Sequence, residues 1–192
     1  MTAEDRYPFA TAPGDQNMEA LMLGVLTCLC EALSAAGRAV CCCMWFRGAA
    51  RPPMDGCDCS CSGEQGEGQG VAWIRWISTE DALAYTTNRA VAARGFGAAT
   101  CAATAQKLRV TFELGIYRCV TAGDPESGPD CGEQTQAAAD GAWDDRLLRD
   151  TAHCCPALAG RAAVMLRQES LGPSGGCGGS VATFTADLVL RS

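Results

Sequence analysis

Apolar residues recur at helical spacing near the start of the chain. Between residues 17 and 36 they follow one another at offsets of three and four positions, which places them on one face of an α-helix. This apolar stripe consists of Met18, Leu21, Met22, Val25, Leu29, Ala32, Leu33 and Ala36. Asn17 or Asp15 can cap the start of the helix, and Gly37 suits its end.

The clearest strand covers residues 108–119, where apolar and polar residues alternate. The apolar set is Leu108, Val110, Phe112, Leu114 and Ile116, and the other set is Arg109, Thr111, Glu113, Gly115 and Tyr117. This alternation predicts a sheet with one buried face and one polar, solvated face. We therefore expect Arg109 and Glu113 to be largely exposed.

The remaining segments give shorter signals. We expect strands at residues 40–46, 71–78, 162–169 and 181–190, and a helix at 133–155 that Pro156 ends. A Gly-rich segment connects the last two strands as a hairpin. Residues 79–103 are ambiguous, because their alanine content allows a helix over about 79–93 that Gly95 and Gly97 would stop.

The predicted order is helix, strand, long loop, strand, strand, helix, strand, strand. It contains no βαβ alternation, so we expect an α+β fold. This fold is one mostly antiparallel sheet of about four or five strands, with the N-terminal helix and a second helix packed on it. Residues 1–16 are expected to form a flexible N-terminal arm. Residues 17–192 are expected to form a single domain, with a Cys/Gly-rich loop insertion at about 47–70.

The charge of the chain is acidic and unevenly distributed. The formal net charge of −7 and the 48% hydrophobic content disfavour both a basic nucleic-acid reader and a disordered chain. Eight carboxylates lie within residues 121–150, where only Arg146 and Arg149 oppose them, so this stretch holds a net −6. It is interpreted as a solvated helix face with its linker, or as a surface that repels nucleic acid through Asp140, Asp144 and Asp145. The eight carboxylates of this stretch are Asp124, Glu126, Asp130, Glu133, Asp140, Asp144, Asp145 and Asp150.

Fourteen cysteines are unusual for a chain of 192 residues whose acidic N-terminus does not resemble a signal peptide. No apolar run has the length that spans a bilayer, so we expect a soluble protein made in a cytoplasm. Disulfides formed later, small buried thiols and a metal site all remain open. If oxidation occurs, we expect pairing among the loop residues Cys57, Cys59, Cys61, Cys131 and Cys177. Cys28 and Cys30, on the first helix, should stay free.

Motifs for catalysis or metal binding are weak. A zinc site could use the thiolates of Cys57, Cys59 and Cys61 and of residues 41–43. The C-x-C-x-C spacing, however, is tighter than that of the usual zinc knuckle. His153 is the only histidine, and its neighbours in a helix do not face it. The Gly-rich segment lacks the lysine of a phosphate-binding loop. We therefore predict no catalytic, cofactor-binding or metal-binding residue, no cofactor, and no enzymatic activity.

Two short motifs resemble a known family. The sequence ELGIYRC at residues 113–119 and the sequence GPSGGCGG at residues 172–179 occur with an N-terminal amphipathic helix, a strand bearing Trp45 and an acidic helix. This layout resembles the head-to-tail connector proteins of long-tailed phages that infect actinobacteria. The element order is also similar to that of tail terminator proteins, including the one of phage lambda. The similarity covers most of residues 17–190, and the Cys-rich loop at 57–61 and residues 79–103 depart from it.

The resemblance implies a structural protein of the phage virion, assembled in the host cytoplasm. Its subunits would form a ring, probably a hexamer, that caps the tail tube and joins it to the head-side connector. Genomic DNA would pass through the lumen without specific binding, and no membrane would be involved. Release from a reducing cytoplasm to an oxidising exterior would agree with the many cysteines. The alternatives are the adjacent head-to-tail stopper or connector ring and a thiol-rich metal-binding protein.

Overall fold

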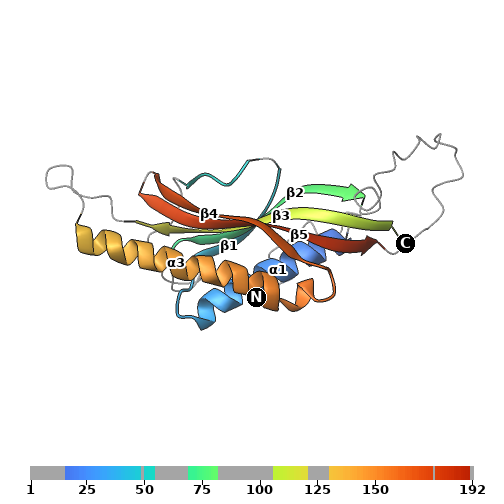
Figure 1. Cartoon of the computed structure of the whole chain (residues 1–192), viewed down its shortest axis with the longest axis horizontal. Coiled ribbons are helices and arrows are strands. Elements are labelled where there is room, and N and C mark those ends of the chain that lie inside the picture. The colour runs from blue at the N-terminus through green and yellow to red at the C-terminus, as the bar shows by residue number, and fades with distance from the viewer. Residues whose placement is uncertain are drawn as a thin grey trace, which may run out of the picture.

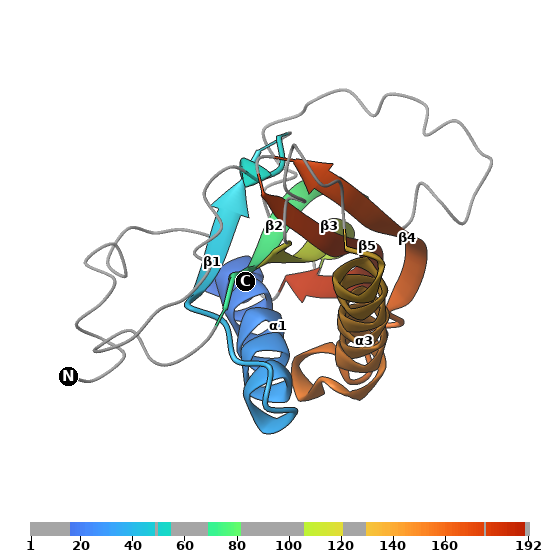
Figure 2. The same cartoon turned by 90° about the vertical axis from the view of Figure 1, so that its left-hand side faces the viewer.

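In the computed structural model, two helices cover one face of a five-stranded sheet (Figure 1, Figure 2). The structure describes residues 16–48, 50–54, 69–81, 106–120, 130–174 and 176–190. The elements are α1 (Gln16–Ala35), β1 (Cys42–Arg47), β2 (Val71–Asp81), β3 (Gln106–Cys119), α3 (Cys131–Cys154), a short 3₁₀ helix η3 (Pro156–Leu158), β4 (Val164–Ser174) and β5 (Cys177–Leu190). The predicted α+β class and the order of its elements are confirmed.

The sheet is open and mixed, with strand order β1-β2-β3-β5-β4. Only β1 and β2 pair in parallel, whereas the other three neighbouring pairs are antiparallel. The longest ladder joins β3 to β5 over their full lengths, so β3 lies at the centre of the sheet as expected. β1 and β4 form the two edges of the sheet.

The core lies between the helices and the inner face of the sheet. The predicted register of β3 is confirmed, because Val110, Phe112, Leu114 and Ile116 are completely buried. The rings of Phe112 and Phe184 stack with centroids 5.7 Å apart. The α1 residues that are completely buried against this face are Met22, Val25, Leu29 and Leu33. Residues 18–35 of α1 are long and apolar enough to cross a membrane, but here their apolar stripe packs against the sheet.

The outer face of the sheet is not the solvated surface that the alternation predicts. Trp73 and Tyr117 are fully buried there, and Glu113 is only 2% exposed, so the expected exposure of Glu113 is wrong. The reason is the chain segment that follows β1, at residues 50–54. Pro52 of this segment is buried, and its carbonyl oxygen accepts a hydrogen bond of 3.1 Å from the Tyr117 hydroxyl. Arg109 is also less exposed than expected, with 31% of its side chain accessible, and it pairs with Asp187.

Strands β2 to β5 are all longer than predicted, and β3 begins at Gln106 and β5 at Cys177. β2 continues to Asp81, so residues 79–81 are strand rather than the start of a helix. The rest of that candidate helix lies outside the described residues, as do residues 55–68 of the predicted loop insertion. β4 extends to Ser174, so part of the Gly-rich segment is strand and the turn is short. Gly176 lies in this turn at a φ of 81°, a conformation that favours glycine.

The two motifs behind the family resemblance lie side by side in the fold. The end of ELGIYRC in β3 pairs with the end of GPSGGCGG in β5, with Tyr117 opposite Gly179 and Cys119 opposite Cys177. A Cβ atom on Gly179 would lie 2.4 Å from the Ile116 carbonyl oxygen, so the strands pack too closely there for a larger residue. Gly115 has a similar role, because the Trp73 indole covers it.

Replacing Gly115 with alanine should destabilise the protein by about 1–3 kcal/mol, because an added methyl group overpacks this site. A Cβ atom at Gly115 would lie 2.1 Å from the Trp73 ring. Gly141→Ala in α3 is a matched control, since nothing lies within 4 Å of a Cβ there, and alanine favours a helix. Urea denaturation should show a loss for the first variant and no loss for the second. Equal stability of Gly115→Ala and the parent would contradict the assigned packing.

Candidate functional site

An ion-pair cluster joins α3 to the end of β3 and to the residues after α1. Arg38 donates to Asp140 at 2.8 Å and to Asp144 at 3.0 Å. Arg118 of β3 donates to the other carboxylate oxygen of Asp144 at 2.9 Å. Asp144 is 2% exposed and therefore binds two guanidinium groups away from solvent. The cluster connects three separate parts of the chain around one buried carboxylate.

Backbone carbonyl groups complete the hydrogen bonding of these arginines. Arg118 also donates to the carbonyl oxygens of Gln69 and Arg38, at 2.6 and 2.9 Å. Burial alone would lower the pKa of Arg38, but its hydrogen bonds to Asp144 and Asp140 outweigh this and raise the pKa above its ordinary value. Arg38 therefore stays charged at any physiological pH, and the cluster acts as a structural clamp.

This clamp corrects part of the interpretation of the acidic stretch as a solvated face. Asp130, Glu133 and Asp150 are exposed as that interpretation predicts, whereas Arg38 and Arg118 pair with Asp140 and Asp144. Asp144 is buried, so it cannot belong to a surface that repels nucleic acid. Asp145 is partly covered and accepts a hydrogen bond of 3.3 Å from Ser170 of β4. Of the three residues proposed for that surface, Asp140 alone lies at the rim of the cluster, with 41% of its side chain exposed.

A groove of about 1180 Å³ lies beside the clamp, between the first half of α3 and the ends of the strands. Small residues form much of its wall, among them Gly37, Ala137, Gly141, Gly178 and Gly179. The charged residues of the clamp also line it, but they already pair with one another. The groove therefore offers mainly a small-residue wall to anything that packs against it.

A second charged cluster occupies the outer face of the sheet. Glu113 accepts hydrogen bonds of 2.7 Å from both Arg75 and Arg51, and Arg51 also donates to Glu169 at 3.1 Å. Burial of Glu113 would raise its pKa, but the hydrogen bonds from Arg51 and Arg75 outweigh this and hold the pKa below its ordinary value of 4.5. Burial raises the pKa of the adjacent Tyr117. The ionised Glu113 thus holds the segment at residues 50–54 against the sheet.

The stability of the protein should fall as the pH drops below about 4.5. Because the folded-state pKa of Glu113 is depressed, its stabilising contribution is complete above its unfolded-state value and is lost as the pH falls through the folded value. Asp187, whose pKa is lowered by Lys107 and Arg109 against the effect of burial, should add a loss in the same window. Thermal unfolding from pH 7 to pH 3 measures this. Glu113→Gln should show a lower melting temperature at pH 7 and a shallower acid loss, whereas exposed Glu133→Gln should retain the parent profile.

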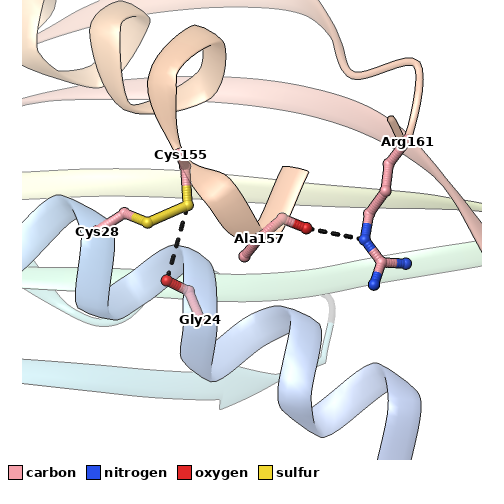
Figure 3. Close-up of a disulfide and its surroundings, with 5 residues drawn as sticks. All are labelled: Gly24, Cys28, Cys155, Ala157 and Arg161. Carbon is pink, nitrogen blue, oxygen red and sulfur yellow. Dashed lines mark hydrogen bonds between the residues drawn. A yellow bond between two sulfur atoms is a disulfide. The ribbon is translucent and has the colours of Figure 1, made fainter. Parts of the chain in front are cut away.

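The cysteine pairing differs from the sequence prediction. The expectation that Cys28 and Cys30 stay free is wrong, because both are in disulfides. Cys28 joins Cys155 after α3 (Figure 3), and Cys30 joins Cys43 of β1. The two cysteines flank the buried stripe of α1 on opposite sides. Figure 2 shows α1 between β1 and α3, so each cysteine meets a different neighbour. The apolar stripe of the helix indicates these positions, but the partners depend on the tertiary fold.

The other predicted cysteine pairs are only partly described. Cys177 is disulfide-bonded as expected, although it lies buried in β5 rather than in a loop, and Cys41 and Cys119 are disulfide-bonded as well. Cys131, another of the five residues among which some pairing is expected, is free and exposed like Cys154, and it is the first residue of α3 rather than a loop residue. Residues 57–61, with their three cysteines, lie outside the described residues.

Exposed apolar side chains mark a further feature that the sequence analysis missed. Val164 and Leu166 are 53% and 58% exposed on the edge strand β4, and Trp143 is 51% exposed on α3. Val164 follows the short segment after η3, and Leu166 lies at a β-bulge between Met165 and Arg167. The apolar signal in the sequence, Val-Met-Leu, is present but does not reveal that this strand forms an edge. Exposed apolar residues on a sheet edge are typical of an interaction surface.

No arrangement for catalysis is visible in the part of the chain that the structure describes. His153 is exposed at the end of α3, and within the described ranges no three His, Cys, Asp or Glu side chains come together as metal ligands would.

Comparison with known proteins adds no assignment. No protein-family model matches the chain, and no curated protein matches it significantly.

Proposed function

We propose that this chain is a structural subunit of a phage neck, most specifically the tail terminator that caps the tail tube and meets the head-side connector. One observation supports this above the others. The elements occur in the order expected from the resemblance, with both helices on one face of a single open sheet. The two motifs of the resemblance also pair with each other at the centre of the sheet.

The chemistry of the subunit agrees with a role in assembly. The disulfides and the buried ion pairs hold α1, α3, β1 and β3 together as a rigid block. Apolar side chains are exposed on a sheet edge and on α3, where they can pack against other subunits. A ring subunit that is loaded by packaged DNA and by the tail needs both properties.

Deletion of the gene in the phage that encodes it would test this role. A tail terminator stops tube growth, so its loss should give tails of uncontrolled length and DNA-filled heads without tails. Loss of a head-side stopper or connector should instead leave tails of normal length that fail to attach. Electron microscopy of the lysate separates these outcomes. Normal, infectious particles would rule out both neck layers.

The purified protein should show no measurable affinity for duplex DNA at about 150 mM salt. A passive conduit must let the polyanion slide, whereas tight phosphate binding needs clustered, unpaired Lys and Arg. In this chain Arg38, Arg75 and Arg118 already pair with carboxylates. Fluorescence anisotropy with a labelled duplex measures the affinity. Submicromolar binding that weakens steeply with salt would contradict the conduit role.

A further inference from the structure

We propose that neighbouring copies of this chain join by pairing β4 of one copy with β1 of the next, in antiparallel orientation. The sheet would then continue from subunit to subunit. This inference rests on the proposed ring, since it names the contact from which such a ring is built. The occupant of the β4 edge is thus a second copy of this chain.

The β4 edge exposes apolar residues, whereas edge strands usually carry residues that prevent pairing with a strand of another molecule. Lysine, proline and inward-facing charges commonly block such edges. The first six residues of β4, Val164–Glu169 in order VMLRQE, contain neither lysine nor proline, and the exposed Arg167 pairs with Glu169 of the same strand. Their bulge, itself a common protective device, here presents Leu166 to solvent, and Val164 is exposed beside it. This half of the edge is therefore suited to an apolar strand.

β1 supplies such a strand at the other edge of the sheet. Its sequence, CCMWFR, is uncharged until the final Arg47 and contains no proline. Met44 and Phe46 lie on the outer face with the second apolar cluster, and Trp45 lies on the inner face. All three side chains are only partly buried within the single chain. Aromatic and β-branched residues paired across strands are among the favourable contacts of antiparallel sheets.

The strand directions fit this contact. Since β1 runs parallel to β2, and each step from β2 through β3 and β5 to β4 is antiparallel, β1 and β4 point in opposite directions. A copy placed beside β4 by continuing the sheet thus presents an antiparallel β1. The contact uses two different edges, so each copy retains one edge for the next neighbour. Such head-to-tail contacts close into rings when the rotation between copies allows it, whereas β4 paired with β4 would stop at a dimer.

Photo-cross-linking from Leu166 would test the pairing. The photoreactive amino acid p-benzoylphenylalanine replaces Leu166, and unlabelled and ¹⁵N-labelled full-length chains are mixed, assembled and irradiated. Mass spectrometry then identifies peptides that join two copies. We expect these cross-links to reach residues 42–47 of the other copy. Cross-links that reach β4 of the other copy, or any surface away from β1, would overturn the inference.

A charged substitution gives a second, independent measurement. Leu166→Glu should weaken assembly at least tenfold in mass photometry, while Val189→Glu, at an exposed apolar site of β5 opposite Lys107 of β3, should assemble like the parent. Circular dichroism verifies that both variants are folded. Equal assembly of the two variants would overturn the β4 contact even if rings form, so the proposed function would survive. A parent protein that stays monomeric at all concentrations would overturn the ring and the contact together.

Discussion

Removing the Cys28–Cys155 disulfide should cost about 5 kcal/mol of unfolding free energy. The bond joins residues 127 positions apart, and the entropy of the unfolded chain falls more when a longer loop is closed. A Cys28→Ala, Cys155→Ala double variant tests this by urea denaturation under oxidising conditions. Its midpoint should be lower than that of the parent.

The second disulfide provides the matched control. The Cys30–Cys43 bond closes only 13 positions, so its removal should cost about 3 kcal/mol. Alanine at the exposed free thiols of Cys131 and Cys154 should leave stability within about 0.5 kcal/mol of the parent. Reduction of the parent should lower its urea midpoint more than alanine at Cys131 and Cys154 does. An equal or smaller shift on reduction would show that the two disulfides do not stabilise the fold.

These disulfides bear on how the subunit would assemble. Under the proposed neck role, the chain folds in a reducing cytoplasm, where its thiols are not yet paired. Besides the disulfides, apolar packing holds α1 on the sheet, because Met22, Val25, Leu29 and Leu33 are fully buried. Folding first brings Cys28 near Cys155, and later oxidation fixes that arrangement. A virion protein would then gain stability after release from the host.

The parts of the fold that follow from local periodicity could be predicted from the sequence. The offsets of three and four define the buried stripe of α1, and the strict alternation in β3 defines its inner face. Both signals arise from the geometry of one element and need no knowledge of its neighbours. The outer face of β3 shows the limit of such signals. Whether Glu113 is exposed depends on Arg51, which lies 62 positions before it, and on Pro52, which lies 65 positions before its partner Tyr117.

The candidate site was less predictable for the same reason. Arg38 lies 106 positions from Asp144 and follows the end of α1, so its charge could not be matched to the acidic stretch by inspection. Cysteine pairing is similarly a property of the tertiary fold and not of spacing. One signal was nevertheless present in the sequence. Arg118 stands in the ELGIYRC motif at the end of the strand, in line with the apolar set that faces the helices, where a basic residue indicates an acidic partner.

Replacing Asp144 with alanine should destabilise the protein by about 3–5 kcal/mol, because it leaves two guanidinium groups in the clamp without their shared carboxylate. Asp144 is 2% exposed, and Arg38 and Arg118 have only 19% and 14% of their side chains exposed. Breaking a buried ion pair by removing one partner leaves a charge that neither water nor protein compensates fully. Chemical denaturation at pH 7 gives the change in unfolding free energy.

Asp150→Ala on the same helix separates this effect from the loss of any acidic residue. Asp150 pairs with Arg146 four positions away, and both side chains are more than half exposed, so its loss should cost at most about 0.5 kcal/mol. Asp144→Asn keeps the shape and part of the hydrogen bonding, so its loss should fall between the two. Equal stability of Asp144→Ala and Asp150→Ala would show that solvent already screens the clamp. In that case the contact between α3 and β3 would depend on apolar packing around Leu148 instead of on the ion pairs.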